Sequence, residues 1–245
     1  VGIVASGLLV PAVLQRLGPA GWPSGWVALA LLAAAGTAAA TIAAYAAPTT
    51  PRAAPGSRRS WVGGLGRLSS GYLLFGAGYI GYMTFIIALL NQVGLSPKEI
   101  AAFWVALGVA GAVSGQVWAR LLRGARGGSA AAVLFVLLAV ATGIPALTSA
   151  TPALYASGAL FGLCFLSLVG AVTAAGRDAV DPADTTAALG MLTTVFALGQ
   201  VVGPWLAGML ADRTGGHQWG LGVSALLLLI GAVLCRLQPA RTTAR

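Results

Sequence analysis

Charged residues are scarce in this chain, and acidic residues are the scarcest. Of 245 residues, 14 are Lys or Arg and five are Asp or Glu, so that only 8% are charged. A soluble domain carries about 25% charged residues, and this composition therefore excludes a soluble globular protein. One histidine and two cysteines do not suggest a disulfide framework or a metal site. The chain is instead apolar, with 58% hydrophobic residues.

Long uncharged runs predict membrane-spanning helices. A helix needs about 20 mainly apolar residues to cross a hydrocarbon core about 30 Å thick. The longest run, 127–176, holds two such helices, because the prolines of PALTSATPAL (145–154) indicate a turn between them. We therefore expect an all-α polytopic membrane protein without a cofactor. Its eight spans are expected at 1–17, 25–47, 70–92, 98–122, 129–149, 152–176, 185–211 and 218–236.

Arginine is distributed unevenly between the two predicted sides of the membrane. The even-numbered loops and the C-terminal tail hold eleven Lys or Arg residues, whereas the odd-numbered loops hold three. Because basic residues are enriched on the cytoplasmic side, we expect the even loops and the C-terminus in the cytoplasm. The net charge of +9 then reflects topology and contact with lipid headgroups of the bilayer. We expect no nucleic-acid partner.

The sequence repeats itself weakly at an interval of 197 residues. At this offset Arg16 aligns with Arg213, and Trp22 aligns with Trp219. Both copies end in Arg-x-Gly-x-x-x-Trp at the predicted outer end of a helix. Because the two copies lie six spans apart, the repeat indicates a six-helix unit that is used twice.

A polar stretch separates the two units. The segment PTTPRAAPGSRRSWVGGLGR (48–67) is rich in Pro, Arg, Ser and Gly and is typical of a flexible linker. Six spans follow it and two precede it, so we expect four N-terminal helices of the same protein to be missing from this chain. The expected domains are 1–47, the last two helices of an N-terminal bundle; 48–69, a basic cytoplasmic linker; 70–236, a C-terminal six-helix bundle; and 237–245, a cytoplasmic tail.

Two six-helix bundles joined by a basic loop resemble the major facilitator superfamily (MFS) of transporters, here from its fifth helix to its twelfth. The segment GMLADRTGG (208–216) resembles the superfamily's G-x-L-A-D-R-x-G signature, although it ends the eleventh helix on the outer side. The segment GQVWARLLRG (115–124) stands where a second copy is expected, with Ala119 in place of the aspartate. FGAGYIGYMTFI (75–86) is similar to the seventh helix of the bacterial YbfB/YjiJ-type branch.

This resemblance implies a secondary active transporter that moves a small organic solute across the bacterial plasma (inner) membrane by alternating access. It does not imply an enzyme. A proton is a candidate coupling ion, but all five acidic residues lie at predicted helix ends or in loops. The acid of a proton relay would then lie in the missing N-terminal helices. A receptor or scaffold of the same fold that does not transport remains the alternative.

Aromatic and polar residues recur on one face of the seventh and eleventh helices of this numbering. A tyrosine hydroxyl that faces lipid lacks a hydrogen-bond partner, so we expect these faces to line the bundle interior or a water-filled cavity. Aromatic packing between helices and substrate contact are both consistent with the spacing. The candidates for substrate contact are Tyr72, Phe75, Tyr79, Tyr82, Thr193, Phe196 and Gln200.

Glycines at four-residue spacing mark three of the predicted helices. Small residues let helices approach closely in lipid, where the hydrophobic effect does not hold them together, and smooth faces suit the rocking of alternating access. In the eighth helix three glycines share a stripe with Trp104 and Trp118, which predicts a tight seam. Pro204 predicts a bend or hinge. The packing and hinge candidates are Gly108, Gly111, Gly115, Gly158, Gly162, Gly199, Gly203, Pro204 and Gly208.

The remaining candidates are charged residues at predicted helix ends. The pair Arg177–Asp178 ends the tenth helix and fits either a capping and salt-bridge cluster or a cytoplasmic gate. The others belong to the two signature-like segments. The motif and gate candidates are Arg120, Arg177, Asp178, Asp212 and Arg213.

Overall fold

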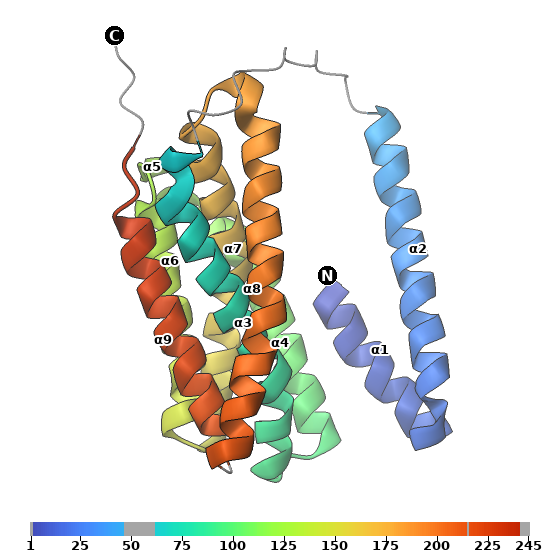
Figure 1. Ribbon diagram of the computed structural model, residues 1–245. Coiled ribbons are helices and arrows are strands. Elements are labelled where there is room, and N and C mark those ends of the chain that lie inside the picture. The colour runs from blue at the N-terminus through green and yellow to red at the C-terminus, as the bar shows by residue number, and fades with distance from the viewer. Residues whose placement is uncertain (1, 47–61, 215, 241–245) are drawn as a thin grey trace.

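The fold is a set of long apolar helices (Figure 1). The computed structural model describes residues 2–46, 62–214 and 216–240, and these form nine α-helices and three short 3-10 helices, without a strand. Seven helical segments are long and apolar enough to cross a membrane, and the 16-residue α1 is shorter. The prediction of an all-α polytopic membrane protein is thus confirmed. The α-helices are α1 (Gly2–Leu17), α2 (Trp22–Ala46), α3 (Gly66–Gln92), α4 (Pro97–Val117), α5 (Ala119–Gly124), α6 (Ser129–Leu147), α7 (Thr151–Asp178), α8 (Thr185–Thr214) and α9 (His217–Arg236).

The helix boundaries follow the predicted spans to within a few residues, with two corrections. The turn predicted at 145–154 shrinks to residues 148–150, because Pro145 lies inside α6 and Pro152 lies in the first turn of α7. Proline is tolerated in the first turn of a helix because the N–H groups there have no acceptor within the helix, so the N–H that proline lacks is not needed. The span predicted at 98–122 is interrupted at Trp118, which separates α4 from α5. Residues 48–61 of the expected linker and 241–245 of the tail lie outside the described residues.

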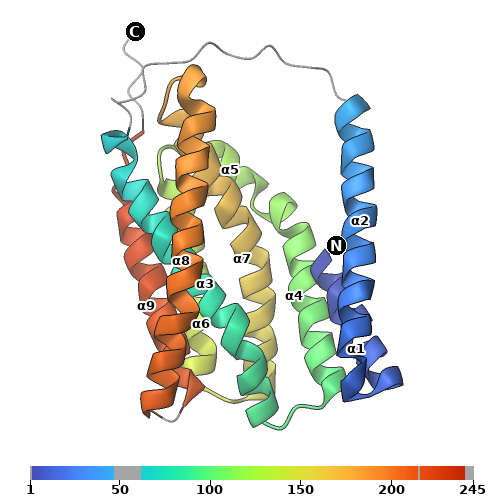
Figure 2. The same cartoon turned by 45° about the vertical axis from the view of Figure 1, so that its right-hand side comes forward.

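Six of the long helices pack together. Helix α3 packs along α8 and α9, α6 packs along α7 and α9, and α4 packs along α7. Helices α1 and α2 form a hairpin beside this group, and α1 packs against α4 (Figure 2). The largest fully buried side chains are aromatic: Phe75, Tyr82, Phe103, Phe135 and Phe161.

Glycines set the distance between helices at two seams. At the α3–α8 seam, a methyl group built on Gly199 would overlap the carbonyl oxygen of Leu73, and one built on Gly203 would overlap that of Ala77. At the α4–α7 seam, a methyl group on Gly162 would overlap the carbonyl oxygen of Leu107. Backbone therefore meets backbone at both seams, as is typical of helix packing in lipid.

The other glycines differ in their surroundings. A methyl group on Gly158 would overlap the ring of Phe103, whereas one on Gly208 would make ordinary contact, 3.5 Å from the ring of Phe85. The stripe on α4 is divided between two neighbours: Gly108 meets Val4 of α1, and Gly111 meets the Gly162 carbonyl of α7. The remaining two candidates are Gly115, with nothing within 4 Å of an added methyl group, and Pro204, inside α8.

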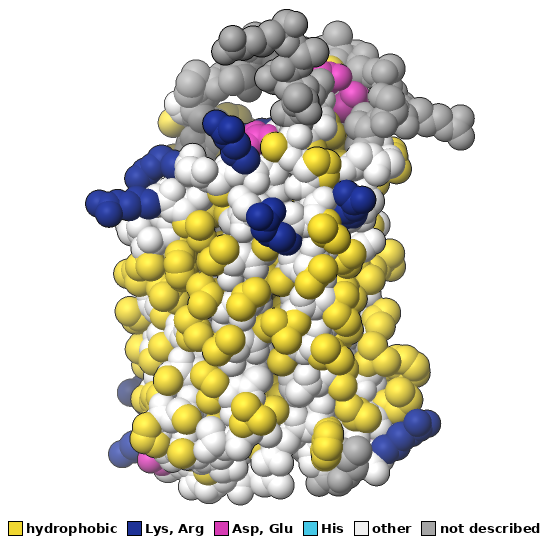
Figure 3. Space-filling model, turned by 90° about the vertical axis from the view of Figure 1, so that its left-hand side faces the viewer, with side chains coloured by type: hydrophobic (Ala, Val, Ile, Leu, Met, Phe, Trp, Pro, Cys, Tyr) yellow, Lys and Arg dark blue, Asp and Glu magenta, His cyan; other side chains and the backbone are white. Residues whose placement is uncertain are grey.

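On the face that Figure 3 shows, an apolar belt lies between two zones that carry Lys and Arg. Within the described residues, one end of the bundle carries six arginines, and we name it the arginine-rich end. The opposite end carries Arg16, Lys98 and Arg213. The residues of the arginine-rich end are Arg67, Arg120, Arg123, Arg126, Arg177 and Arg236.

Candidate functional site

An aromatic cluster joins α3 to α8. Phe196 of α8 stacks on three rings of α3, with centroid distances of 4.8 Å to Tyr72, 5.4 Å to Phe75 and 5.5 Å to Tyr79. The three α3 residues share a face because they are spaced by three and four positions. Such stacked pairs add stability beyond the area that they bury. The two faces singled out in the sequence are therefore neighbours in the structure.

One hydrogen bond adds polarity to this cluster. The Nε2 of Gln200 donates to the hydroxyl oxygen of Tyr79 over 2.6 Å, and both side chains are half-buried. A tyrosine hydroxyl that accepts a bond still has a proton to donate, and the glutamine amide still has a carbonyl acceptor and a second N–H. The pair can thus offer both donors and an acceptor at the edge of an aromatic surface.

The structure places Tyr82 apart from this edge, in the core. Its ring stacks on Phe161 with centroids 4.1 Å apart, and its hydroxyl lies 2.8 Å from Oγ of Ser157. Ser157 donates its own proton to the carbonyl of Ala141 over 2.7 Å, so Tyr82 is the donor to Ser157. This chain of bonds ties α3, α7 and α6 together. Sequence reasoning missed Ser157, although a serine in the middle of an apolar span needs such a partner.

Three phenylalanines that sequence reasoning also missed extend the cluster. Phe165 stacks on Tyr79 at 6.4 Å and on Phe161 at 5.6 Å, which makes a continuous aromatic row through α7. Phe135 of α6 meets the ring of Phe75 edge-on at 5.9 Å. No sequence signal distinguishes these rings from other apolar core residues, because their partners lie on different helices.

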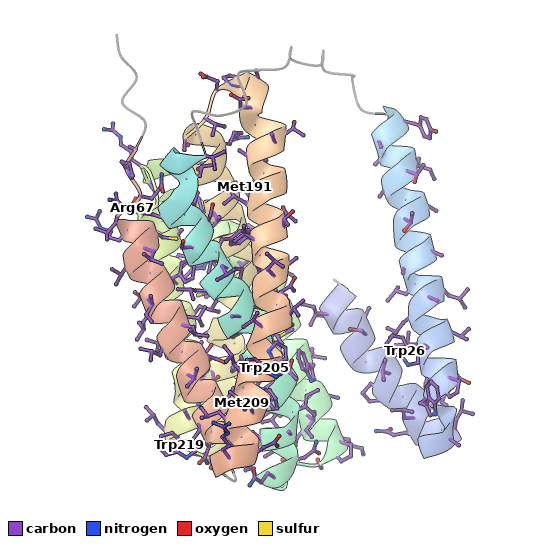
Figure 4. All side chains as sticks on the ribbon, viewed as in Figure 1. Trp26, Arg67, Met191, Trp205, Met209 and Trp219 are labelled. Carbon is purple, nitrogen blue, oxygen red and sulfur yellow. The ribbon has the colours of Figure 1, made fainter. Side chains whose placement is uncertain are left out.

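Helix α8 has two faces of different character, one half-buried at Phe196 and Gln200 and one exposed. Thr193 and Gln200 are two turns apart, on the side of Phe196, and the hydroxyl of Thr193 donates to the carbonyl of Leu189 over 2.8 Å. Thr194, the next residue, lies on the other face, where helical spacing adds large apolar side chains. These are Leu198, Val201 and Trp205, with exposed fractions of 56%, 74% and 64%, of which Trp205 is labelled in Figure 4.

A cavity of about 800 Å³ lies between α1, the end of α3 and the start of α4. Its wall is mostly apolar and includes Trp104, whose Cβ would lie 3.0 Å from a methyl group on Gly7. Asn91 and Gln15 bring amides to this cavity. Neither residue belongs to the aromatic cluster, and no residue of that cluster lines the cavity.

The charged candidates lie at the two ends of the molecule. Arg177 and Asp178 are exposed in the last turn of α7, and Arg120 is exposed on α5. Asp212 and Arg213 are exposed near the end of α8, at the opposite end. The structure brings none of them to the aromatic cluster. Within the described residues, no three His, Cys, Asp or Glu side chains are grouped so that they could hold a metal ion.

The packed apolar helices define the class of protein, a polytopic α-helical membrane protein. The sequence narrows this class to MFS transporters: residues 1–236 match the family described as "Uncharacterised MFS-type transporter YbfB". The chain belongs to this family. A comparison with curated proteins gives no match.

Proposed function

We propose that this protein is a secondary active transporter that moves a small, uncharged or amphipathic organic solute by alternating access. Its family supports transport in general. The observation that carries the finer proposal is the Tyr79–Gln200 hydrogen bond at the half-buried edge of the aromatic cluster. Aromatic faces suit the apolar part of a solute, and a few polar groups fix its orientation.

The electrical character of the cluster supports an uncharged solute. Its members are aromatic rings and one amide, and the charged side chains among the described residues lie at helix ends or in connections. An ionic group in a membrane protein interior needs a charged or strongly polar partner. A neutral molecule with an amide, a hydroxyl or a ring nitrogen can form hydrogen bonds with Tyr79 and Gln200 and needs no charged partner.

The proposal includes a topology. The arginine-rich end and the tail (237–245) face the cytoplasm of a bacterial cell, and residues 70–236 form the C-terminal bundle. Residues 1–47 belong to the first bundle and connect through the linker at 48–69. The bare surface of α2, along which nearly every residue is exposed, supports this division, with four further helices completing the first bundle. A coupling proton would use an acid on those helices.

Alternating access in this proposal is a rocking of one bundle against the other. The contact between Gly108 of α4 and Val4 of α1 would lie on the boundary between the bundles. The α3–α8 seam, where Gly199 and Gly203 meet the backbone of α3, would move as a unit within the second bundle.

The test is uptake into proteoliposomes by the protein expressed from its complete reading frame, first with a mixture of neutral organic solutes under proton or sodium gradients. With a transported solute in hand, Gln200→Leu and Tyr79→Phe are expected to lower its apparent affinity by about tenfold each, because one hydrogen bond to a solute is worth about 1–1.5 kcal/mol. Thr193→Val addresses the same face of α8, and Thr194→Val on the other, exposed face of α8 is the matched control. It should transport like the wild type.

Two results would contradict the proposal. Uptake at the wild-type level by both Gln200→Leu and Tyr79→Phe would show that the aromatic cluster is not part of the binding site. A reconstituted protein that binds a solute but moves none under any gradient would favour the receptor or scaffold alternative.

A further inference from the structure

A groove between α6 and α9 opens at the arginine-rich end, on the side of the molecule that Figure 3 shows. Its volume is about 420 Å³, and its wall is formed by apolar side chains that include Val133, Val136 and Val233. These valines are 45%, 43% and 59% exposed, so the groove is open to the surroundings of the bundle. At its mouth lies the guanidinium-bearing Arg236.

Two further arginines are held next to residues that line the groove. Arg67, at the start of α3, donates from Nη1 to the carbonyl of Leu237 over 2.9 Å. Arg126, before α6, is tied to Ser129, whose hydroxyl donates to the Arg126 carbonyl over 2.8 Å and accepts from its amide over 3.2 Å. Both Leu237 and Ser129 line the groove. Arg236 thus lines the groove itself, while Arg67 through its guanidinium and Arg126 through its main chain are bonded to residues that line it.

A buried glutamine fixes these elements relative to one another. Gln238, only 5% exposed, accepts from the amide of Leu68 over 3.2 Å and donates to the carbonyl of Gly64 over 2.9 Å. Its own carbonyl accepts from the amide of Gly128 over 3.4 Å. The beginning of α3, the turn before α6 and the end of α9 are therefore joined at one residue. These bonds hold the main chain beside Arg67, Arg126 and Arg236 in one place.

The charge of this mouth calls for an anionic partner. None of the residues that line the groove is acidic, and the described acidic residues of this end, Asp178, Asp181 and Asp184, belong to α7 and the segment before α8. Guanidinium groups bind phosphate through charge-assisted hydrogen bonds. An apolar groove that runs directly from such a phosphate site suits a hydrocarbon chain.

We infer that this groove binds an anionic phospholipid of the leaflet at the arginine-rich end. The headgroup phosphate lies at Arg236, with Arg67 and Arg126 beside it, and one acyl chain lies along Val133, Val136 and Val233. Basic pockets between transmembrane helices are known to take phospholipid headgroups in this way. The inference depends on neither the solute nor the direction of transport.

The experiment uses the full chain, purified in detergent and stripped of lipid. Phosphatidylglycerol or phosphatidylcholine with identical acyl chains is titrated, and retained lipid is counted by native mass spectrometry. We expect one phosphatidylglycerol to be retained with at least about fivefold higher affinity than phosphatidylcholine, since one arginine near a headgroup of net negative charge contributes about fivefold, and the choline ammonium cancels the phosphate charge of phosphatidylcholine. Arg236→Gln should lower the affinity by about fivefold, and adding Arg126→Gln should lower it further.

The matched control is Arg123→Gln, which removes the same charge from the same end but from α5, outside the groove. It should retain the lipid like the wild type. Val133→Trp fills the groove from an exposed position and should abolish retention while leaving the helical circular dichroism unchanged.

Three results would overturn the inference. Equal losses from Arg236→Gln and Arg123→Gln would indicate a diffuse charge effect. Full retention by Val133→Trp would show that no acyl chain occupies the groove. Displacement of the lipid by inorganic phosphate at an equal concentration would assign the arginines to a soluble anion instead of a phospholipid.

Discussion

The close backbone contact at the α3–α8 seam predicts that Gly203→Ala lowers the stability of the protein. The added methyl group would overlap the carbonyl oxygen of Ala77 and lie 2.7 Å from its Cα. Both groups are backbone, so no side chain can rotate away, and the two helices have to separate. Overpacking of this kind costs about 1–3 kcal/mol, of which the higher helix propensity of alanine returns about 0.5–1 kcal/mol. We expect a net loss of about 0.5–2 kcal/mol.

The assay can use the two cysteines of the chain as reporters. Cys164 and Cys235 are free and fully buried, so a thiol-reactive fluorescent dye labels them only when the bundle opens on heating. A change of 1 kcal/mol shifts the melting temperature by about 2–4 °C for a protein of this size. Gly203→Ala should therefore lower the melting temperature by about 1–8 °C.

Gly115→Ala is the matched control for this prediction. It makes the same chemical change inside a helix, but nothing lies within 4 Å of the added methyl group. The gain in helix propensity should then raise the melting temperature slightly. The reasoning would be refuted by a Gly203→Ala protein at least as stable as the wild type, or by equal destabilisation from both substitutions.

Five further substitutions test three other contacts by the same thermal assay. Ser157→Ala should destabilise the bundle by about 1–3 kcal/mol, since it leaves the Tyr82 hydroxyl buried without its partner. Tyr82→Phe leaves Ser157 bonded to Ala141 and should cost about 1 kcal/mol. A larger loss from Tyr82→Phe than from Ser157→Ala would contradict the direction assigned to these bonds. Gln238→Ala should cost about 1–3 kcal/mol by removing both bonds to the start of α3, and an unchanged melting temperature would show that the junction is dispensable. Ser96→Ala removes the cap of α4 and should cost about 1 kcal/mol, with Ser96→Thr, which keeps a hydroxyl that can accept from the Glu99 amide and donate to its carboxylate, restoring stability; failure of Ser96→Thr to restore it would assign another role to the serine.

The helices could be predicted from the sequence because the membrane imposes a single simple requirement. Any segment that crosses it needs about 20 apolar residues, and its backbone must be helical. Prediction of 25–47 and 185–211 therefore came close to Trp22–Ala46 and Thr185–Thr214. The errors arose at helix ends. The start of α3 lies four residues before the predicted 70, because a charge such as that of Arg67 ends an apolar run but does not end a helix.

Contacts between helices were harder to predict. Spacing along one helix shows which residues share a face, but it does not show that one stripe meets two neighbours, as Gly108 and Gly111 of α4 do. Gln238 is a second example, because its partners lie 170 or more residues away and only the folded chain brings them together. The aromatic faces of α3 and α8 could be recognised in advance, whereas the burial of Tyr82 depended on Ser157 of a third helix. Their role in solute binding stays a prediction.

The backbone contacts at Gly199 and Gly203 bear on how this protein could change over generations. The two helices are held together by main-chain atoms, while the surface beside them consists of side chains such as Phe196 and Gln200. Substitutions at those side chains can therefore alter the surface without loosening the helix pair beneath it. In the proposed transporter, such substitutions would change the solute that is bound while the helix pair stays the same.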